Sequence, residues 1–178
     1  MAEQVEETFA IVCDASVSAE NNVSAICVEI HYTNQSLRHG GPVTKQIVYA
    51  TKRIECGTTS EAEFCARHLG LKLLINYETV LRATRQQLTG LHVDDVVPVV
   101  LFNDNREVLD QRQNRDRLRR LLGRVSQRFG VMVDFQWISR RDPFYQSVDR
   151  GARASLRDNG LAEEIRIQGP GVLPYLGN

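Results

Sequence analysis

Three consecutive segments of this chain have the composition of β-strands, and only short polar loops separate them. Residues 9–14, 23–32 and 43–54 are rich in β-branched, aromatic and other apolar side chains, whereas the loops between them are polar. Such segments favour extended structure, and strands joined by short loops pair as antiparallel neighbours. The chain is therefore expected to begin with an antiparallel meander whose first strand delivers Asp14 into a turn of small residues.

The hydrophobic period changes after residue 57. Side chains at Ala62, Ala66, Leu69, Leu73 and Tyr77 recur at helical spacing and predict a helix of about 17 residues. A polar bridge then leads to a strand at 96–102, an arginine-rich helix within 106–128, a strand at 131–138 and a helix at 144–156. Because a β-α-β connection makes a parallel pair, this order predicts an α/β fold. Its five-stranded mixed sheet would have three antiparallel and two parallel strands, with helices on both faces.

Length and charge limit the organisation of the chain. The 178 residues suffice for one domain with a substantial core. We expect a lead-in at residues 1–8, the domain at 9–158 and an irregular extension, rich in glycine and proline, at 159–178. The formal net charge of +0 gives no general attraction for polyanions. Any nucleic-acid binding must therefore depend on how the charges are distributed.

The cysteines and the hydropathy pattern indicate a reducing compartment. The cysteines have irregular spacing and no C-x-x-C pair, which favours neither a zinc site nor a disulfide framework; they are Cys13, Cys27, Cys56 and Cys65. The chain has no N-terminal apolar segment of the secretory type, and no apolar run approaches the ~18 residues that cross a bilayer. The sequence predicts a soluble, cytoplasmic protein without membrane association.

Four short polar motifs occur in order on the expected elements, and each contains a carboxylate. They are Asp14-Ala15-Ser16 after the first strand, Thr58-Thr59-Ser60-Glu61-Ala62-Glu63 at the first helix, Asn103-Asp104-Asn105 after the fourth strand, and Asp149-Arg150-Gly151-Ala152-Arg153-Ala154 in the last helix. Each motif is common by chance, but the joint order is a stronger signal. A buried aspartate such as Asp14 is costly without a partner, and a metal ion is one such partner.

This pattern resembles the type 1 ribonuclease H proteins, over about residues 9–156. The family motifs read Asp-Gly-Ser, Thr-Asn-Asn-x-Ala-Glu, Ser/Thr-Asp-Ser and Asp-x-x-Ala-x-x-Ala. The resemblance implies a ribonuclease-H-like fold with a catalytic cluster that holds two Mg²⁺ or Mn²⁺ ions; its members would be Asp14, Glu63, Asp104 and Asp149. Carboxylate oxygens suit these ions, whereas the absence of a Cys/His cluster argues against zinc.

The activity implied by the resemblance is hydrolysis of the RNA strand of RNA–DNA hybrids by a metal-dependent endoribonuclease with a two-metal-ion mechanism. Substrate contacts are expected from polar residues near the carboxylates: Ser16, Thr59, Ser60, Asn105, Arg140 and Arg141. Two alternatives stay open. The same fold could cleave double-stranded RNA or structured DNA, or it could serve as a catalytically weak adaptor that binds nucleic acid. The oligomeric state is also left open.

Several of these carboxylates have structural alternatives. Ser60-x-x-Glu63 and Asp104-x-x-Glu107 have the spacing of capping boxes. Asp149 and Arg153 have the spacing of an i,i+4 ion pair. The arginine-rich helix within 106–128 has the composition of a solvated amphipathic face as well as that of a surface for phosphates.

The loop before the last helix differs from the family pattern. Family members commonly carry a histidine there that assists proton transfer and product release, whereas this chain has Ser139-Arg140-Arg141-Asp142. Arginine supplies positive charge but cannot shuttle a proton at neutral pH. Slower turnover is therefore expected. Trp137, just before this loop, is expected in the core.

Overall fold

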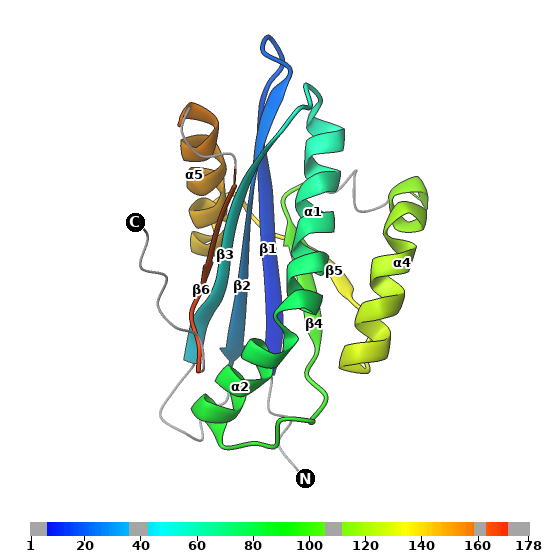
Figure 1. Cartoon of the computed structure of the whole chain (residues 1–178), viewed down its shortest axis with the longest axis vertical. Coiled ribbons are helices and arrows are strands. Elements are labelled where there is room, and N and C mark those ends of the chain that lie inside the picture. The colour runs from blue at the N-terminus through cyan, green and yellow to red at the C-terminus, as the bar shows by residue number, and fades with distance from the viewer. Residues whose placement is uncertain (1–6, 36–42, 106–111, 159–162, 171–178) are drawn as a thin grey trace.

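A mixed sheet with the strand order β5-β4-β1-β2-β3-β6 runs through the middle of the structure (Figure 1). The computed structural model describes residues 7–35, 43–105, 112–158 and 163–170. The strands are β1 (Glu7–Ser18), β2 (Val23–Asn34), β3 (Val43–Ile54), β4 (Val99–Asn103), β5 (Asp134–Trp137) and β6 (Glu163–Ile167). The helices are α1 (Thr59–Asn76), α2 (Glu78–Thr89), α4 (Arg112–Phe129) and α5 (Pro143–Arg157).

The pairing of the strands confirms the predicted α/β architecture. β1, β2 and β3 form the antiparallel meander, and β4 and β5 add to its β1 edge as parallel strands. In the β1–β4 pair, Val12 lies opposite Phe102. The same register, continued by two residues, brings Asp14 and Asp104 to adjacent positions at this end of the sheet.

The prediction of five strands is wrong, because the described part of the chain has six. The additional strand, β6, lies within the segment expected to be an irregular extension and pairs antiparallel with β3. Ile165 and Ile167 pack against the core from this strand. These isoleucines alternate with polar residues, as expected for a strand with one buried face. The partner of this strand lies more than a hundred residues earlier in the sequence.

Two other boundaries differ from the expectation. β1 begins at Glu7, within the expected lead-in, and continues through Asp14 to Ser18, because residues 14–18 pair with residues 23–27 of β2. Asp14 thus lies inside a strand and does not enter a turn. The polar bridge after α1 is largely the helix α2.

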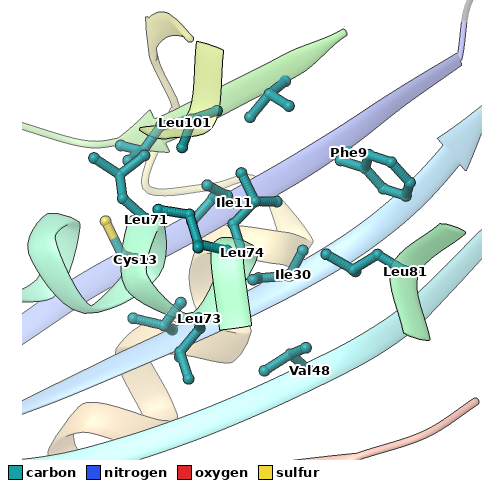
Figure 2. Close-up of a cluster of buried hydrophobic side chains, with 14 of the residues drawn as sticks. Phe9, Ile11, Cys13, Ile30, Val48, Leu71, Leu73, Leu74, Leu81 and Leu101 are labelled. Carbon is teal, nitrogen blue, oxygen red and sulfur yellow. The ribbon is translucent and has the colours of Figure 1, made fainter. Parts of the chain in front are cut away.

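Helices cover both faces of the sheet (Figure 1). On one face, α1, α2 and α4 bury a large core with the odd-numbered side chains of β1, among them Phe9, Ile11 and Cys13 (Figure 2). On the other face, α5 buries a smaller core around Val12 and Cys27. Asp14 follows Val12 at strand spacing, so its side chain emerges on the α5 face.

Two glycines let these helices lie close to the sheet. A Cβ at Gly70 of α1 would be 2.7 Å from Cγ2 of Ile11, and a Cβ at Gly151 of α5 would be 2.6 Å from Sγ of Cys27. Glycine permits such close packing because it has no side chain. The helices that carry Glu63 and Asp149 are therefore held directly against β1 and β2.

The arginine-rich segment forms α4 from Arg112 onward, while residues 106–111, including Glu107 of the second suggested capping box, lie outside the described residues. The apolar side of α4 packs into the core through Leu118, Val125 and Phe129. Arg117 forms an ion pair with Glu61 at 2.8 Å and lies over the ring of Phe64. Among the helices that the structure describes, none is both long and apolar enough to span a membrane.

Candidate active site

Asp14 and Asp104 come from neighbouring parallel strands. Asp14 lies in β1 and is 3% exposed, while Asp104 directly follows β4 and its side chain is 6% exposed. β4 ends at Asn103. The end of β4 opens a space beside β1, and both carboxylates reach it.

Glu63 reaches the same space from the first turns of α1 and is 3% exposed. The N-cap residue of this helix is Thr58, not Ser60, and it makes no side-chain capping bond. The Glu63 carboxylate instead accepts a hydrogen bond of 2.7 Å from Nδ2 of Asn103. The capping-box interpretation of Ser60 and Glu63 is therefore wrong.

These carboxylates form a compact group. One oxygen each from Asp14, Glu63 and Asp104 lies within 4.8 Å of the others. Oxygen donors at this separation suit a hard divalent cation such as Mg²⁺ or Mn²⁺. The donor set thus fits the ion class that the resemblance implies.

Asp149 lines the same cleft but lies outside that compact group. It projects from α5, its side chain is 25% exposed, and Oδ1 accepts a 2.9 Å bond from Nε of Arg153. The i,i+4 ion pair suggested by the sequence is therefore present. The pair and a place in the cleft are compatible, because Asp149 lines the cleft together with Asp14, Glu63 and Asp104.

The carboxylates are held in a setting that opposes their ionisation. Burial raises the pKa of Asp14 to about 8, and the charge of Glu63 is the next cause. Burial also raises the pKa of Glu63 to about 7, although the Asn103 hydrogen bond and the Arg67 guanidinium act in the opposite direction. A divalent cation would offset both the burial of the carboxylates and their mutual repulsion, because its positive charge favours their ionised form.

Polar residues predicted to contact substrate divide into two groups. Ser16, Thr59, Asn105 and Arg140 line the cleft, which has a volume of about 1020 Å³. Ser60 and Arg141 are exposed and, among the described residues, are not part of this lining. The structure therefore brings Arg140, and not Arg141, to the carboxylates.

Among the described residues at the site, three buried polar side chains were not identified as site residues from the sequence. Tyr145 of α5 lines the cleft and is 7% exposed, and burial followed by the charge of Asp14 raises the pKa of its hydroxyl. Asn103 and Arg67 are buried beside Glu63. Of these residues only Asn103 belongs to one of the four motifs, and its amide gave no indication of its partners.

Trp137 is not a core residue, as the sequence had suggested, because it is 46% exposed. Its indole Nε1–H donates to the backbone oxygen of Asp104 at 3.0 Å, and the ring lines the cleft. β5 is the edge strand of the sheet. An edge strand leaves one side of a tryptophan in contact with solvent.

Comparison with known proteins gives a structural likeness without a sequence match. Neither a protein-family model nor a curated protein matches this sequence. The N-terminal RNase H domain of Rv2228c from Mycobacterium tuberculosis, solved as a fusion with maltose binding protein, has a TM-score of 0.51 and 13% identity; the alignment covers 84% of this chain and 93% of that chain.

Two further solved structures have TM-scores of 0.45. RNase H1 from the halophilic archaeon Halobacterium salinarum NRC-1 is 15% identical, over 84% of this chain and 97% of that chain. LC9-RNase H1, described as a type 1 RNase H with the type 2 active-site motif, is 14% identical, over 86% of this chain and 74% of that chain. At these identities a likeness shows the fold alone, and the first structure carries it: the chain has the ribonuclease H fold, as its sequence predicted.

Proposed function

We propose that this protein is a metal-dependent endoribonuclease that hydrolyses the RNA strand of RNA–DNA hybrids. The observation that carries the proposal is the compact group of Asp14, Glu63 and Asp104, whose oxygens lie within 4.8 Å of one another. Ion pairs inside a protein core usually unite opposite charges. Among the described residues, Arg140 pairs with Asp104 and the charge of Arg67 acts on Glu63, but the pKa values of Asp14 and Glu63 are still raised, so the group suits a site that binds a further cation.

The proposed ligands are Asp14, Glu63, Asp104 and Asp149, for two Mg²⁺ or Mn²⁺ ions. These residues would hold the ions, whose chemistry there would be the activation of a water molecule and the stabilisation of the departing oxygen in an in-line displacement at phosphorus. Asp14 has the central place, because the charges of Glu63, Asp104 and Asp149 all act on its carboxylate. The partly exposed position of Asp149 suits a ligand at the open side of the cleft.

Positive charge surrounds the acidic floor of the cleft. Arg140, Arg153 and Arg157 are among the lining residues. Guanidinium groups at this rim suit the phosphates on either side of the cleaved bond, and such contacts position a strand without reading its sequence. Discrimination of RNA from DNA would rest on the 2′-hydroxyl, for which Ser16, Thr59 and Asn105 offer hydrogen-bonding groups in the same cleft.

Tyr145 supplies a hydrogen-bond donor at the site. Burial, followed by the charge of Asp14, keeps the pKa of its hydroxyl far above neutrality. The hydroxyl therefore stays protonated at physiological pH and orients a carboxylate or a phosphate oxygen. It does not shuttle protons, and the arginines of the preceding loop do not either. We accordingly propose that turnover is slower than in family members that have the loop histidine.

A substrate panel tests the proposal. The same labelled RNA strand is presented single-stranded, paired with RNA and paired with DNA, with Mg²⁺ or Mn²⁺, beside a structured DNA. The proposal expects cleavage of the RNA only in the hybrid. Cleavage of the RNA duplex or of structured DNA assigns the fold to another substrate. Binding of hybrid without cleavage of any substrate indicates an adaptor.

A further inference from the structure

Asn103, the last residue of β4, is fully buried and bonds three parts of the chain through one amide. Its Nδ2 donates to Oε2 of Glu63 at 2.7 Å and to the backbone oxygen of Cys13 at 3.1 Å. Its Oδ1 accepts from the backbone N–H of Asn105 at 2.9 Å. The side chain thus uses both ends of its amide within the core.

The partners fix the orientation of this amide. The two short contacts of Nδ2 are to oxygen acceptors, with the Cys13 sulfur farther away at 3.8 Å, and the group near Oδ1 is an N–H donor. A reversed amide would place its carbonyl oxygen against two other oxygens and would leave the N–H of Asn105 facing a second donor. Unpaired polar groups are costly in a buried site. One arrangement is therefore strongly preferred.

Each of these bonds is made either to a clustered carboxylate or to the backbone of a residue next to one in the sequence. Glu63 is bonded directly. Cys13 precedes Asp14 in β1, and Asn105 follows Asp104. A single amide therefore joins the helix that carries Glu63 to the two backbone segments that carry the aspartates. The strand pairing of β1 with β4 accounts for the adjacency of the aspartates, but it does not account for the bond to a carboxylate from α1.

We propose that Asn103 is a positioning residue for divalent cations: it holds the Glu63 carboxylate in the orientation that a cation at Asp14 and Asp104 requires. This inference rests on the proposed metal site. A glutamate has several rotatable bonds, and a donor on Oε2 fixes its rotamer while leaving Oε1 outside that bond. Partners that orient a metal ligand usually contribute strongly to metal affinity. An amide does this without adding a charge to the site.

Asn103 departs from the residue type of the family motif. The ribonuclease H proteins that the sequence resembles have Ser or Thr at the position of Asn103. A hydroxyl has a single donor and a shorter reach, so it cannot donate to Cys13 and Glu63 together. The amide therefore provides a connection that a hydroxyl in the same place would lack.

Direct Mn²⁺ binding separates positioning from general stability. Isothermal titration with Mn²⁺ alone and the melting temperature without metal are measured for the wild type, Asn103→Leu and Asn103→Ser. Thr84→Val is the matched control, because Thr84 is 2% exposed, its Oγ1 donates to the oxygen of Val80 at 2.8 Å on α2, and it does not line the cleft. We expect both Asn103 variants to bind Mn²⁺ about 10- to 100-fold more weakly. Thr84→Val should lower the melting temperature and leave the Mn²⁺ dissociation constant unchanged.

Each outcome supports or overturns the inference. If Asn103→Leu does not fold, Asn103→Ser, which keeps a polar group, decides. A wild-type dissociation constant in a folded Asn103 variant overturns the positioning role while leaving the metal site intact. A wild type that does not bind Mn²⁺ at all overturns the proposed function, and the inference with it.

Discussion

Nε of Arg140 donates to Oδ2 of Asp104 at 2.8 Å, although the Arg140 side chain is 81% exposed and the Asp104 side chain only 6% exposed. The bond links the loop before α5 to the carboxylate group. Arg140 thus belongs to the loop in which the sequence resemblance would have placed a histidine. A cation on Asp104 would compete with this bond and would leave the guanidinium free to contact a phosphate.

Arg140→Gln should raise the KM for an RNA–DNA hybrid. Loss of this one charged contact should lower kcat/KM by about 5- to 30-fold. The measurement is steady-state cleavage at several salt concentrations. Arg166→Gln is the control for net charge. Arg166 belongs to β6, its guanidinium lies over the ring of Tyr49, and it does not line the cleft. Equal effects of the two substitutions would show that Arg140 acts only through overall charge.

Replacing both loop arginines tests the expected slow turnover. The double variant Arg140→Gln/Arg141→Gln should have a lower single-turnover rate than the wild type, because no positive charge of this loop then remains near the scissile phosphate. Single-turnover rates equal to those of ribonucleases H with the loop histidine, and unaffected by this double substitution, would contradict the account of the loop.

The stability of the metal-free protein should fall as the pH rises between about 4 and 8. An unfolded carboxyl group has a pKa near ~4, whereas the folded structure raises the pKa of Asp14 to about 8 and that of Glu63 to about 7. Within this window the folded state binds more protons than the unfolded state, so a rise in pH favours unfolding. Below the window both states are protonated and the contribution to the slope vanishes.

The melting temperature in the presence of a chelator measures this effect. The difference between Asp14→Asn and the wild type isolates it from other titrating groups, and it should grow in favour of the variant as the pH approaches 8. Addition of Mn²⁺ should stabilise the wild type at pH 8, because an ion that binds only the folded state shifts the equilibrium. A difference that is constant with pH would contradict the burial of these charges.

Asp149→Asn should impair the site less than Asp14→Asn. Asp149 is partly exposed and lies outside the compact group, whereas Asp14 is one of its members. In a titration of cleavage rate against Mn²⁺ concentration, high Mn²⁺ should partly restore Asp149→Asn but not Asp14→Asn. The reverse order would place the central ligand on α5 rather than on β1.

Arg85→Met should destabilise the fold without altering the cleft. Arg85 and Glu7 form a buried ion pair at 2.6 Å, at the end of β1 remote from Asp14. Removal of one partner leaves a buried charge and typically costs about 3–5 kcal/mol, which denaturant unfolding would detect. The exposed pair of Arg166 and Glu164 provides the contrast, since Arg166→Gln should cost less than about 1 kcal/mol. Below the melting transition, Arg85→Met should keep wild-type kcat.

The sequence predicted those features that local patterns encode. The β-branched and aromatic content of β1 to β3, the short loops between them and the helical period of α1 led to the architecture, and the order of the motifs led to Asp14, Glu63, Asp104 and Asp149. The structure then brings these residues to one cleft.

Features that depend on distant partners could not be predicted in this way. α2 was interpreted as a polar bridge because its sequence contains charged residues such as Arg85. Arg85 is buried only because it pairs with Glu7, 78 residues away. β6 is short, and its pairing with the edge of β3 has no local signal. Asn103 next to Asp104 looked like a minor departure from the family, since its contacts with Glu63 and Cys13 exist only in three dimensions.

Cleavage of a labelled RNA–DNA hybrid with Mn²⁺, by the wild type and by Asp14→Asn, tests the central claim most directly. The account predicts products from the RNA strand with the wild type, none without a divalent ion, and a loss of activity in a variant that is folded and stable. Equal cleavage by Asp14→Asn, or no cleavage by a wild type that binds the hybrid and Mn²⁺, would contradict it.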